Sequence, residues 1–195
     1  MSFRLGLTGS IGMGKSTTAK MFAAEGCAVW DADAAVHRLY SGAAVPAFQA
    51  EFPDAIVNGV VSRDALKRLI SADKGVLKRI EAIIHPLVRE DRARFAKKKS
   101  AGILVFDIPL LFETDSAQEF DAIVCVTVAP ELQRQRVLDR GTMTDEQFQM
   151  ILAKQMPISE KVARSDYVIE TDTMDHARAQ VQDVVADIQR RMRDA

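Results

Sequence analysis

The chain has 195 residues, which is long for one compact domain and short for two full domains. Its 26 basic residues nearly balance 27 acidic ones, which argues against a general nucleic-acid or membrane-surface binder. No apolar run approaches the ~20 residues of a membrane span, and no basic-then-apolar leader opens the chain. We expect a cytoplasmic protein that binds neither nucleic acid nor membranes and needs no obligate protein partner. Cys27 and Cys125 are predicted to be reduced thiols in the core.

The first predicted elements flank a glycine-rich stretch. The alternating pattern of Phe3–Leu7 predicts a strand, and the residues from Thr18 onward favour a helix that ends at Gly26. Between them, Gly9 to Ser16 meets the pattern G-x-x-x-x-G-K-[ST] in full. In such a loop, backbone N–H groups and the helix N-terminus point at phosphate oxygens. The sequence therefore predicts a nucleoside triphosphate site made of Gly12, Met13, Gly14, Lys15, Ser16 and Thr17.

Within this site, Lys15 is expected to reach the β- and γ-phosphates and the Ser16 hydroxyl to bind Mg²⁺. Lys15 is interpreted as an exposed loop residue that contributes little to packing. A common GTPase switch is excluded because Asn58, the only asparagine, is not part of an N-K-x-D motif. The L-S-G-G-Q run of transporter ATPases is also absent. Phosphoryl transfer to a second small molecule suits the chain better, because helical insertions can exclude water during transfer.

The next predicted strand, Cys27–Trp30, leads directly into two carboxylates at Asp31 and Asp33. Carboxylates at the C-terminal end of a parallel strand face the ligand crevice. One aspartate is expected to cap the following helix. Asp33 is the candidate for chemistry, either as the base that accepts a proton from an attacking hydroxyl or as a water-mediated Mg²⁺ ligand.

The long middle segment reads as helical, with runs at 45–52, 63–70 and 72–84. Pro86 is expected to break or restart the last of these helices, which places His85 near a helix start. One helical face is predicted to carry Leu77, Ile80, Ile84 and Leu87.

A buried strand at Ile103–Ile108 contains Asp107, which sits where a Walker B acid would sit and is a second candidate for water-mediated Mg²⁺ binding. Further strands are predicted at Ile123–Val128 and Tyr167–Ile169, with helices at 131–140 and 145–156 between them. Thr144 to Gln147 fits a capping box. A final amphipathic helix carries Val181, Val184, Val185 and Ile188.

The block between the last two strands concentrates basic residues. Most such residues are expected to be solvated and paired with neighbours such as Glu131 and Asp139. One arginine could instead close over the transferring phosphoryl group. The basic residues are Arg134, Arg136, Arg140, Lys154, Lys161 and Arg164.

The strand and helix order predicts an α/β fold with a five-stranded parallel sheet and helices on both faces. Five motifs in their order resemble the dephospho-coenzyme A kinase family along the whole chain: G-L-T-G-x-I-G-x-G-K-S at 6–16, D-A-D at 31–33, H-P-L at 85–87, P-L-L-F-E at 109–113 and Q-x-x-R-x-x-x-R ending at Arg140. Gln155, Lys161 and Asp166 follow the family as well. One departure is the run Val168 to Asp172, where the family commonly has V-I-D-N, so adenine contacts there are left open.

The resemblance implies transfer of the γ-phosphate of ATP to the ribose 3′-hydroxyl of dephospho-CoA, with Mg²⁺ as cofactor. It implies a P-loop core at 1–40, 101–135 and 165–195, a helical acceptor-binding insertion at about 41–100 and a lid at about 136–164. Arg140 would come from the lid. The residues that would line the acceptor site are His85, Pro109, Leu110, Leu111 and Phe112.

Two other functions compete with this one. Another nucleoside or nucleotide kinase would share the phosphate loop but lacks the later motifs in this order. A nucleotide-dependent switch would bind the triphosphate without a small-molecule acceptor, and Asp33 argues against it.

Overall fold

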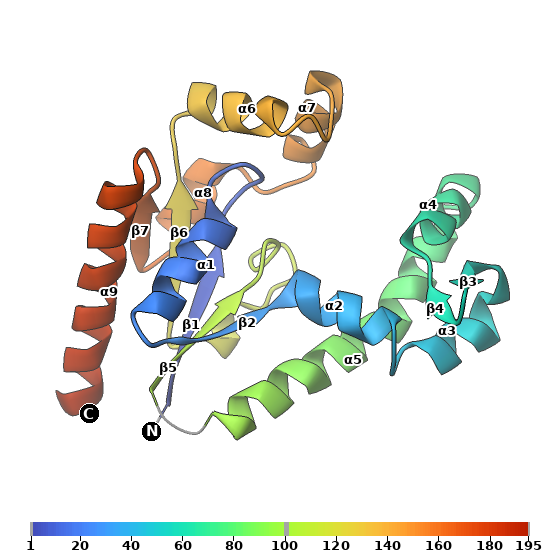
Figure 1. Ribbon diagram of the computed structural model, residues 1–195, viewed down its shortest axis with the longest axis horizontal. Helices are drawn as coiled ribbons and strands as arrows, with labels where there is room; N and C mark the ends of the chain where they lie inside the picture. The colour runs from blue at the N-terminus through green and yellow to red at the C-terminus, as the bar shows by residue number, and fades with distance from the viewer. Residues whose placement is uncertain (1, 100–101, 195) are drawn as a thin grey trace. The chain divides into compact units, whose positions relative to one another are not determined.

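The computed structural model describes residues 2–99 and 102–194. The chain divides into two compact units, and each is described by itself (Figure 1). The first unit comprises Met1–Trp30 and Lys99–Ala195, and the second comprises Asp31–Lys98.

The first unit is built on a five-stranded sheet with the order β2-β5-β1-β6-β7. β1 lies at its centre and pairs in parallel with β5 and with β6, which in turn pairs in parallel with β7. All five predicted strands are confirmed. Their bounds are β1 Ser2–Thr8, β2 Ala28–Asp31, β5 Gly102–Asp107, β6 Ala122–Thr127 and β7 Tyr167–Glu170.

Helices cover both faces of this sheet, as the near-continuous apolar strands require. Val124 and Val126 of β6 belong to one core cluster with α1 (Lys15–Ala24) and α9 (Met174–Asp194). Successive strand residues point to opposite faces, so Cys125 points to the other face, where α8 (Ile158–Ala163) packs against β6. Figure 1 shows α1 and α9 side by side. The predicted apolar face of α9 is buried: Val181, Val184, Val185 and Ile188.

The helices between β6 and β7 are α6 (Pro130–Asp139), α7 (Asp145–Leu152) and α8. The predicted capping box is confirmed, since the Thr144 side chain accepts from the Gln147 backbone while the Gln147 side chain accepts from the Thr144 backbone. The prediction of a single helix over 145–156 is wrong at its C-terminal end, because α7 ends at Leu152. A proline at 157 disfavours helical backbone at the residue before it, so a new helix starts afterwards.

The second unit has its own apolar core under α2 (Ala32–Tyr40), α3 (Val45–Glu51), α4 (Arg63–Ala72) and α5 (Gly75–Lys98). Short 3₁₀ turns occur at Pro53–Ala55 here and at Ala117–Glu119 in the first unit. The core is made of Leu39, Ala44, Phe48, Phe52, Ala55, Val61, Ala65, Leu66, Val76, Ile80 and Ile84.

A two-stranded hairpin in the second unit was not expected. Its strands are β3 (Ile56–Val57) and β4 (Val60–Val61), which pair antiparallel. Asn58 and Gly59 form the turn with φ of 53° and 78°. Asn-Gly is the sequence signal for a turn that needs two positive φ values, so the sequence contained this information.

The break predicted at Pro86 is wrong, because α5 runs through it without interruption. His85 is therefore an exposed residue inside a helix and not at a helix start. A proline in a helix interior costs about 3 kcal/mol. Apolar residues on both sides of Pro86 pack into the core: Ile84 is buried and Leu87 is partly buried. Full burial of one such side chain contributes about 1.5–3 kcal/mol, so this packing offsets the cost of the proline. Leu77, predicted on this face, is 43% exposed.

The longest helices, α5 and α9, carry charged residues throughout their lengths. In the described part of the chain, no helix is both long enough and apolar enough to cross a membrane.

Candidate nucleotide-binding site

The loop between β1 and α1 adopts a conformation that needs its glycines. Gly12 and Gly14 have φ of +79° and +84°, which side-chain-bearing residues rarely adopt. A Cβ at Gly12 would also lie 2.5 Å from Val137 Cγ2, so α6 packs directly against the loop.

Backbone N–H groups of this loop converge at the N-terminus of α1. Met13 N donates to Ser10 O at 3.2 Å, and Thr17 N and Thr18 N both donate to Gly14 O at 3.0 Å. Within the described chain, no protein acceptor takes the N–H groups of Gly12, Gly14, Lys15 or Ser16. Together with the partial positive charge of a helix N-terminus, these donors form an anion site.

Lys15, the first residue of α1, forms an ion pair with Asp107. The side chains are 14% and 2% exposed, so the prediction of an exposed lysine is wrong. The reason is the strand register: Leu7 on β1 lies opposite Asp107 at the end of β5, which brings the carboxylate beside the loop. The ion pair holds a cation next to the free N–H groups.

Ser16 and Thr17 are exposed in the first turn of α1. The Ser16 hydroxyl and the Asp107 carboxylate are oxygen donors, the ligand type that Mg²⁺ prefers. The residues present therefore fit this metal.

Two glutamines hold the tip of the loop, and the sequence reasoning missed their role. Gln133 Nε2 on α6 donates to Ile11 O at 2.7 Å, and Ile11 N donates to Gln155 Oε1 at 3.3 Å. Both glutamines belong to the motifs quoted above, but sequence spacing does not reveal that both bind the backbone of Ile11. The two polypeptide segments that flank α7 are thereby fixed to the phosphate loop.

Arg140 follows the last residue of α6 and is exposed. It lies three residues beyond Val137 and seven beyond Gln133, so it continues the α6 face that contacts the loop. No carboxylate of the described residues lies within ion-pair distance of its guanidinium.

Three other basic residues of this block have specific partners, and among the described residues none of these partners is Glu131 or Asp139, so the expected pairing is wrong. Arg134 Nε donates to Asp145 at 2.8 Å, and the Arg164 guanidinium lies 4.6 Å from the centre of the Phe112 ring. Arg136 donates to backbone oxygens at the end of β7. Distant acids and carbonyls thus compete successfully with neighbours on the same helix.

The turn after β5 contains the predicted acceptor-site residues Pro109 to Phe112. Leu111 and Phe112 are buried at 0% and 5% exposure, whereas Leu110 is 43% exposed. Pro109 O accepts from Thr8 Oγ1 and from Lys161 Nζ, both at 3.1 Å. The turn is therefore tied to the end of β1 and to α8.

Lys161 is fully buried, although the sequence placed it among solvated charges. Its Nζ lies 2.8 Å from Glu113 Oε1, which also accepts from Met156 N at 2.9 Å. Burial raises the pKa of Glu113, but the hydrogen bonds from Lys161 and Met156 outweigh that effect and lower it overall. A buried ion pair of this kind loses much stability when one partner is removed.

Glu113→Gln is expected to lower the free energy of unfolding at neutral pH by about 3 kcal/mol, because it removes the counter-charge of the buried Lys161. A carboxyl group whose pKa is lower in the folded protein than in the unfolded chain stabilises the folded state at pH values above the unfolded-chain pKa. This stabilisation is lost as the pH falls through the pKa of the folded protein. The difference between the two proteins should therefore shrink as pH falls below 4.5. Urea unfolding across a pH series measures it. Glu90→Gln, which breaks the exposed Glu90–Arg94 pair, is the control and should change little.

Asp33 and His85 belong to the second unit. The Asp31 side chain accepts from Ala34 N at 2.9 Å and caps α2, as one of the two aspartates was expected to do. Asp33 lies exposed in the first turn of α2.

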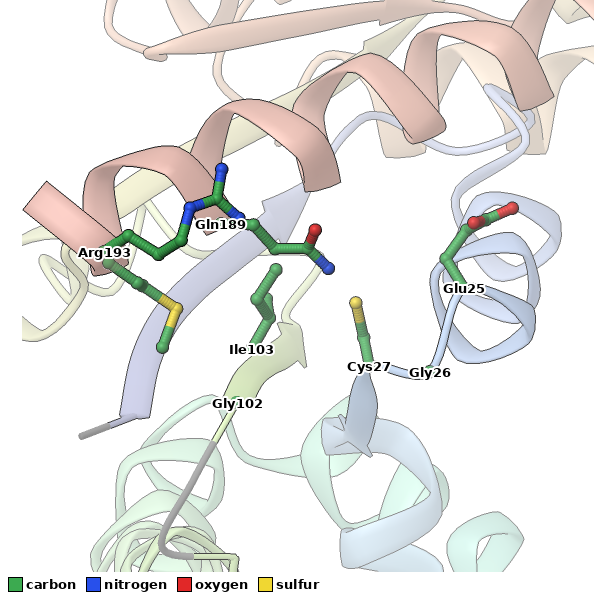
Figure 2. Close-up of a pocket in the computed structure, with 8 residues that line it drawn as sticks. Glu25, Gly26, Cys27, Gly102, Ile103, Gln189 and Arg193 are labelled. Atoms are coloured by element: carbon green, nitrogen blue, oxygen red, sulfur yellow. The ribbon is translucent and has the colours of Figure 1, made fainter.

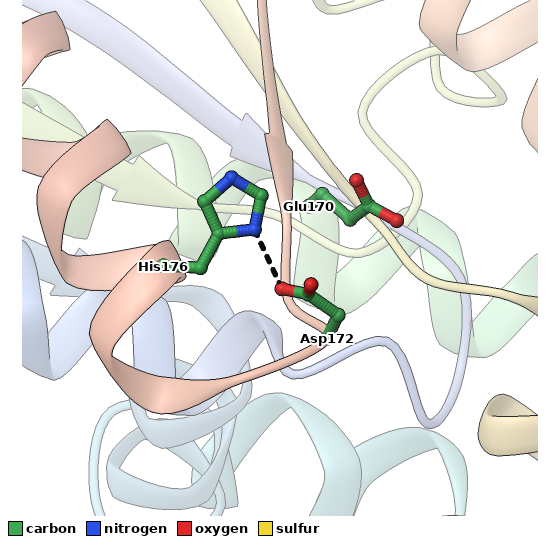
Figure 3. Close-up of side chains that lie close together, drawn as sticks. All are labelled: Glu170, Asp172 and His176. Carbon is green, nitrogen blue, oxygen red and sulfur yellow. Dashed lines mark hydrogen bonds and ion pairs between the residues drawn. The ribbon is translucent and has the colours of Figure 1, made fainter.

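Another acidic cluster, at the start of α9, is explained by local structure. Asp172 lies 2.7 Å from His176 Nδ1, with Glu170 nearby (Figure 3). Asp172 also accepts from the backbone N–H of Thr173. The hydrogen bond from His176 lowers the pKa of Asp172. The cluster organises the first turn of the helix.

A cavity lies at the amino-terminal ends of β2 and β5, bounded by the last turns of α9 (Figure 2). Cys27 lines this cavity, and burial, with a smaller effect from Glu25, raises its pKa to about 11. Burial likewise raises the pKa of Cys125 to about 11. Both cysteines are free and buried, which confirms the prediction of core thiols. Neither is a reactive nucleophile at neutral pH.

A parallel sheet with an anion-binding loop after its central strand, a lysine at the helix start and an acid on the adjacent strand defines a fold of the P-loop NTPase type. The sequence model of the dephospho-CoA kinase family matches residues 3–176. The chain therefore belongs to the dephospho-CoA kinase family.

Individual relatives agree with this assignment. The dephospho-CoA kinase of Ruegeria pomeroyi is 67% identical over 96% of each chain, and that of Cereibacter sphaeroides is 55% identical over 95% of each. Among solved structures, a Thermus thermophilus protein has a TM-score of 0.87 and 31% identity, covering 95% of this chain and 97% of its own.

Proposed function

We propose that the protein transfers the γ-phosphoryl group of ATP to the ribose 3′-hydroxyl of dephospho-CoA, which yields CoA and ADP. The observation that supports phosphoryl transfer is the set of four uncommitted N–H groups beside the Lys15–Asp107 pair. Family membership over nearly the whole chain supports the acceptor. We also propose the cytoplasm as its compartment, consistent with two free thiols.

In this proposal, the loop from Gly12 to Thr17 binds the phosphates through its uncommitted N–H groups, and Lys15 neutralises charge that develops on the γ-phosphoryl oxygens. Ser16, and through water Asp107 or Asp33, would hold Mg²⁺, which would supply further charge neutralisation. Asp107 positions the Lys15 ammonium. The 3′-hydroxyl oxygen forms a bond to the γ-phosphorus, the bond to the bridging oxygen of ADP breaks, and the proton passes to Asp33.

The second unit, with His85, would contribute to acceptor binding together with the Pro109–Phe112 turn. The segment 136–164 would act as a lid that carries Arg140 and excludes water. The core around β1 would bind the nucleotide. These assignments give each insertion a distinct role.

The test is an assay of ADP release in which dephospho-CoA, adenosine and nucleoside monophosphates are compared as acceptors. We expect rapid release only with dephospho-CoA, and a product one phosphoryl group heavier and phosphorylated at the 3′ position. Preference for a monophosphate would identify another nucleotide kinase. Slow turnover independent of every acceptor would identify a nucleotide switch.

Arg140→Lys is expected to lower kcat about 100-fold at saturating ATP, because one ammonium cannot reproduce the planar fork that binds phosphoryl oxygens. Steady-state kinetics with both substrates saturating measures the effect. Arg134→Lys, six residues earlier on α6 and paired with Asp145, is the control and should retain wild-type kcat. Equal kcat in the Arg140 and Arg134 variants would refute the role of Arg140.

A further inference from the structure

Thr171 lies directly after β7, and its side chain contacts the phosphate loop. The residue is 7% exposed. Its hydroxyl donates to Met13 O at 2.9 Å, with Thr127 O at 3.3 Å as a second acceptor. A Cβ built on Gly14 would lie 3.1 Å from the same hydroxyl oxygen. The Thr171 side chain therefore meets the loop at the peptide that joins Met13 and Gly14.

Arg136 of α6 also binds Thr171. Its Nη1 donates to the Thr171 hydroxyl at 3.1 Å, and its Nη2 donates to Thr171 O at 2.6 Å and to Asp172 O at 3.3 Å. The hydroxyl thus accepts a hydrogen bond from a cation while it donates one to the loop. Such a chain of hydrogen bonds polarises the middle group and strengthens the bond to Met13.

The orientation of one peptide follows from these contacts. In a planar trans peptide the C=O and the following N–H point in opposite directions, and the described chain has no cis peptide bond. Because Met13 O points at Thr171, the Gly14 N–H points away from it. This N–H is one of the four uncommitted donors of the loop.

Because residue 14 is a glycine, the Met13–Gly14 peptide can rotate out of this orientation at little energetic cost. Gly14 has φ of +84°, and without a Cβ it also adopts negative φ at little cost. A rotation of the Met13–Gly14 peptide would turn the N–H away from the anion site and put a carbonyl oxygen there. The Thr171 hydroxyl opposes that rotation, since it binds the carbonyl in only one of the two orientations.

We propose that Thr171, oriented by Arg136, is a positioning residue that fixes the Met13–Gly14 peptide so that the Gly14 N–H binds a phosphate of the nucleotide. The inference rests on the proposed binding of ATP at this loop. It assigns a role to the position where the chain departs from the V-I-D-N pattern.

Thr171→Val tests the proposal because valine keeps the shape of threonine and lacks the hydroxyl. Calorimetry with ADP and with inorganic tripolyphosphate, without any acceptor, should show about tenfold weaker binding of both. Thr171→Ser keeps the hydroxyl and should bind within about twofold of wild type. Adenosine, which lacks phosphates, should bind the three proteins equally.

Thr173→Val is the matched control two residues away. Its hydroxyl accepts from His176 N at the start of α9 and does not touch the loop, so phosphate affinity should be unchanged. Arg136→Gln should weaken tripolyphosphate binding less than Thr171→Val does, because the hydroxyl remains.

Wild-type tripolyphosphate affinity in Thr171→Val would overturn the proposal, and so would a serine variant as weak as the valine variant. A valine variant that does not fold would also count against it, since Thr171 would then be a core-stability residue. These binding measurements contain no phosphoryl acceptor. They therefore still test the role of Thr171 if dephospho-CoA proves not to be the acceptor. Absence of ADP binding in the wild type would instead reject nucleotide binding at this loop.

Discussion

Lys15→Ala is expected to lower kcat by at least about 10³-fold. Lys15 begins α1 and its own N–H is one of the four uncommitted N–H groups; in the proposed function, its ammonium faces the charge that develops on the transferring phosphoryl group. A preorganised cation in a water-poor site is worth more in the transition state than the same charge in water. Steady-state kinetics with ATP and dephospho-CoA at saturation measure the loss of kcat.

The Lys15–Asp107 pair adds a second expectation. Removing the lysine leaves a carboxylate that is 2% exposed without this counter-charge, so the melting temperature should also fall. Lys15→Ala/Asp107→Asn should regain melting temperature without regaining kcat. Lys20→Ala, which removes an exposed lysine of the same helix, is the control for both measurements. Turnover near wild type in a folded Lys15→Ala protein would rule out the role of Lys15.

The phosphate loop and the sheet are predictable from sequence because their determinants are local. The glycine pattern is recognised from the strand before it and the helix after it. Each of the five apolar runs indicates a strand that is buried on both faces of a sheet. The capping box at Thr144 is local in the same sense. Each of these features is decided within a few residues.

The errors arise where distant packing competes with a local rule. Pro86 should end a helix, but the core residues on both sides of it hold α5 together. Lys161 reads as a solvated charge, but Glu113, far away in sequence, makes its burial possible. The burial of Lys15 has the same kind of cause, since the β1–β5 register that supplies Asp107 is a tertiary property.

The site is only partly predictable, for a related reason. Motifs identified the phosphate loop, Gln155 and the residues after β5, but not what each one touches. Thr171 carries no motif signal of its own, and its importance comes from meeting Met13 O across the fold. A β-strand end that is adjacent to the loop in space can be recognised only once the strand order is known.

Asp33→Asn is expected to lower kcat by about 10²–10⁴-fold while ATP affinity changes little. A ribose hydroxyl is a poor nucleophile until a base can take its proton, and asparagine keeps the size of aspartate while losing the basic site. Asp33 is exposed in the first turn of α2, where Asp31 already provides the cap, so the Asp33 carboxylate is available for chemistry. If the transition state is loose, little base help is needed and the loss should lie near 10²-fold.

Three measurements separate the possible roles of Asp33. As a base, Asp33→Asn loses kcat at every Mg²⁺ concentration; as a water-mediated Mg²⁺ ligand, it loses activity that high Mg²⁺ restores. If Asp33 only stabilises the start of α2, the melting temperature of Asp33→Asn falls and its kcat is unchanged. Asp31→Asn is the matched control: asparagine also caps helices well, so kcat and melting temperature should both survive. An Asp33→Asn protein with unchanged kcat would exclude Asp33 as the base, because no other protonation site on the variant side chain could replace the lost carboxylate.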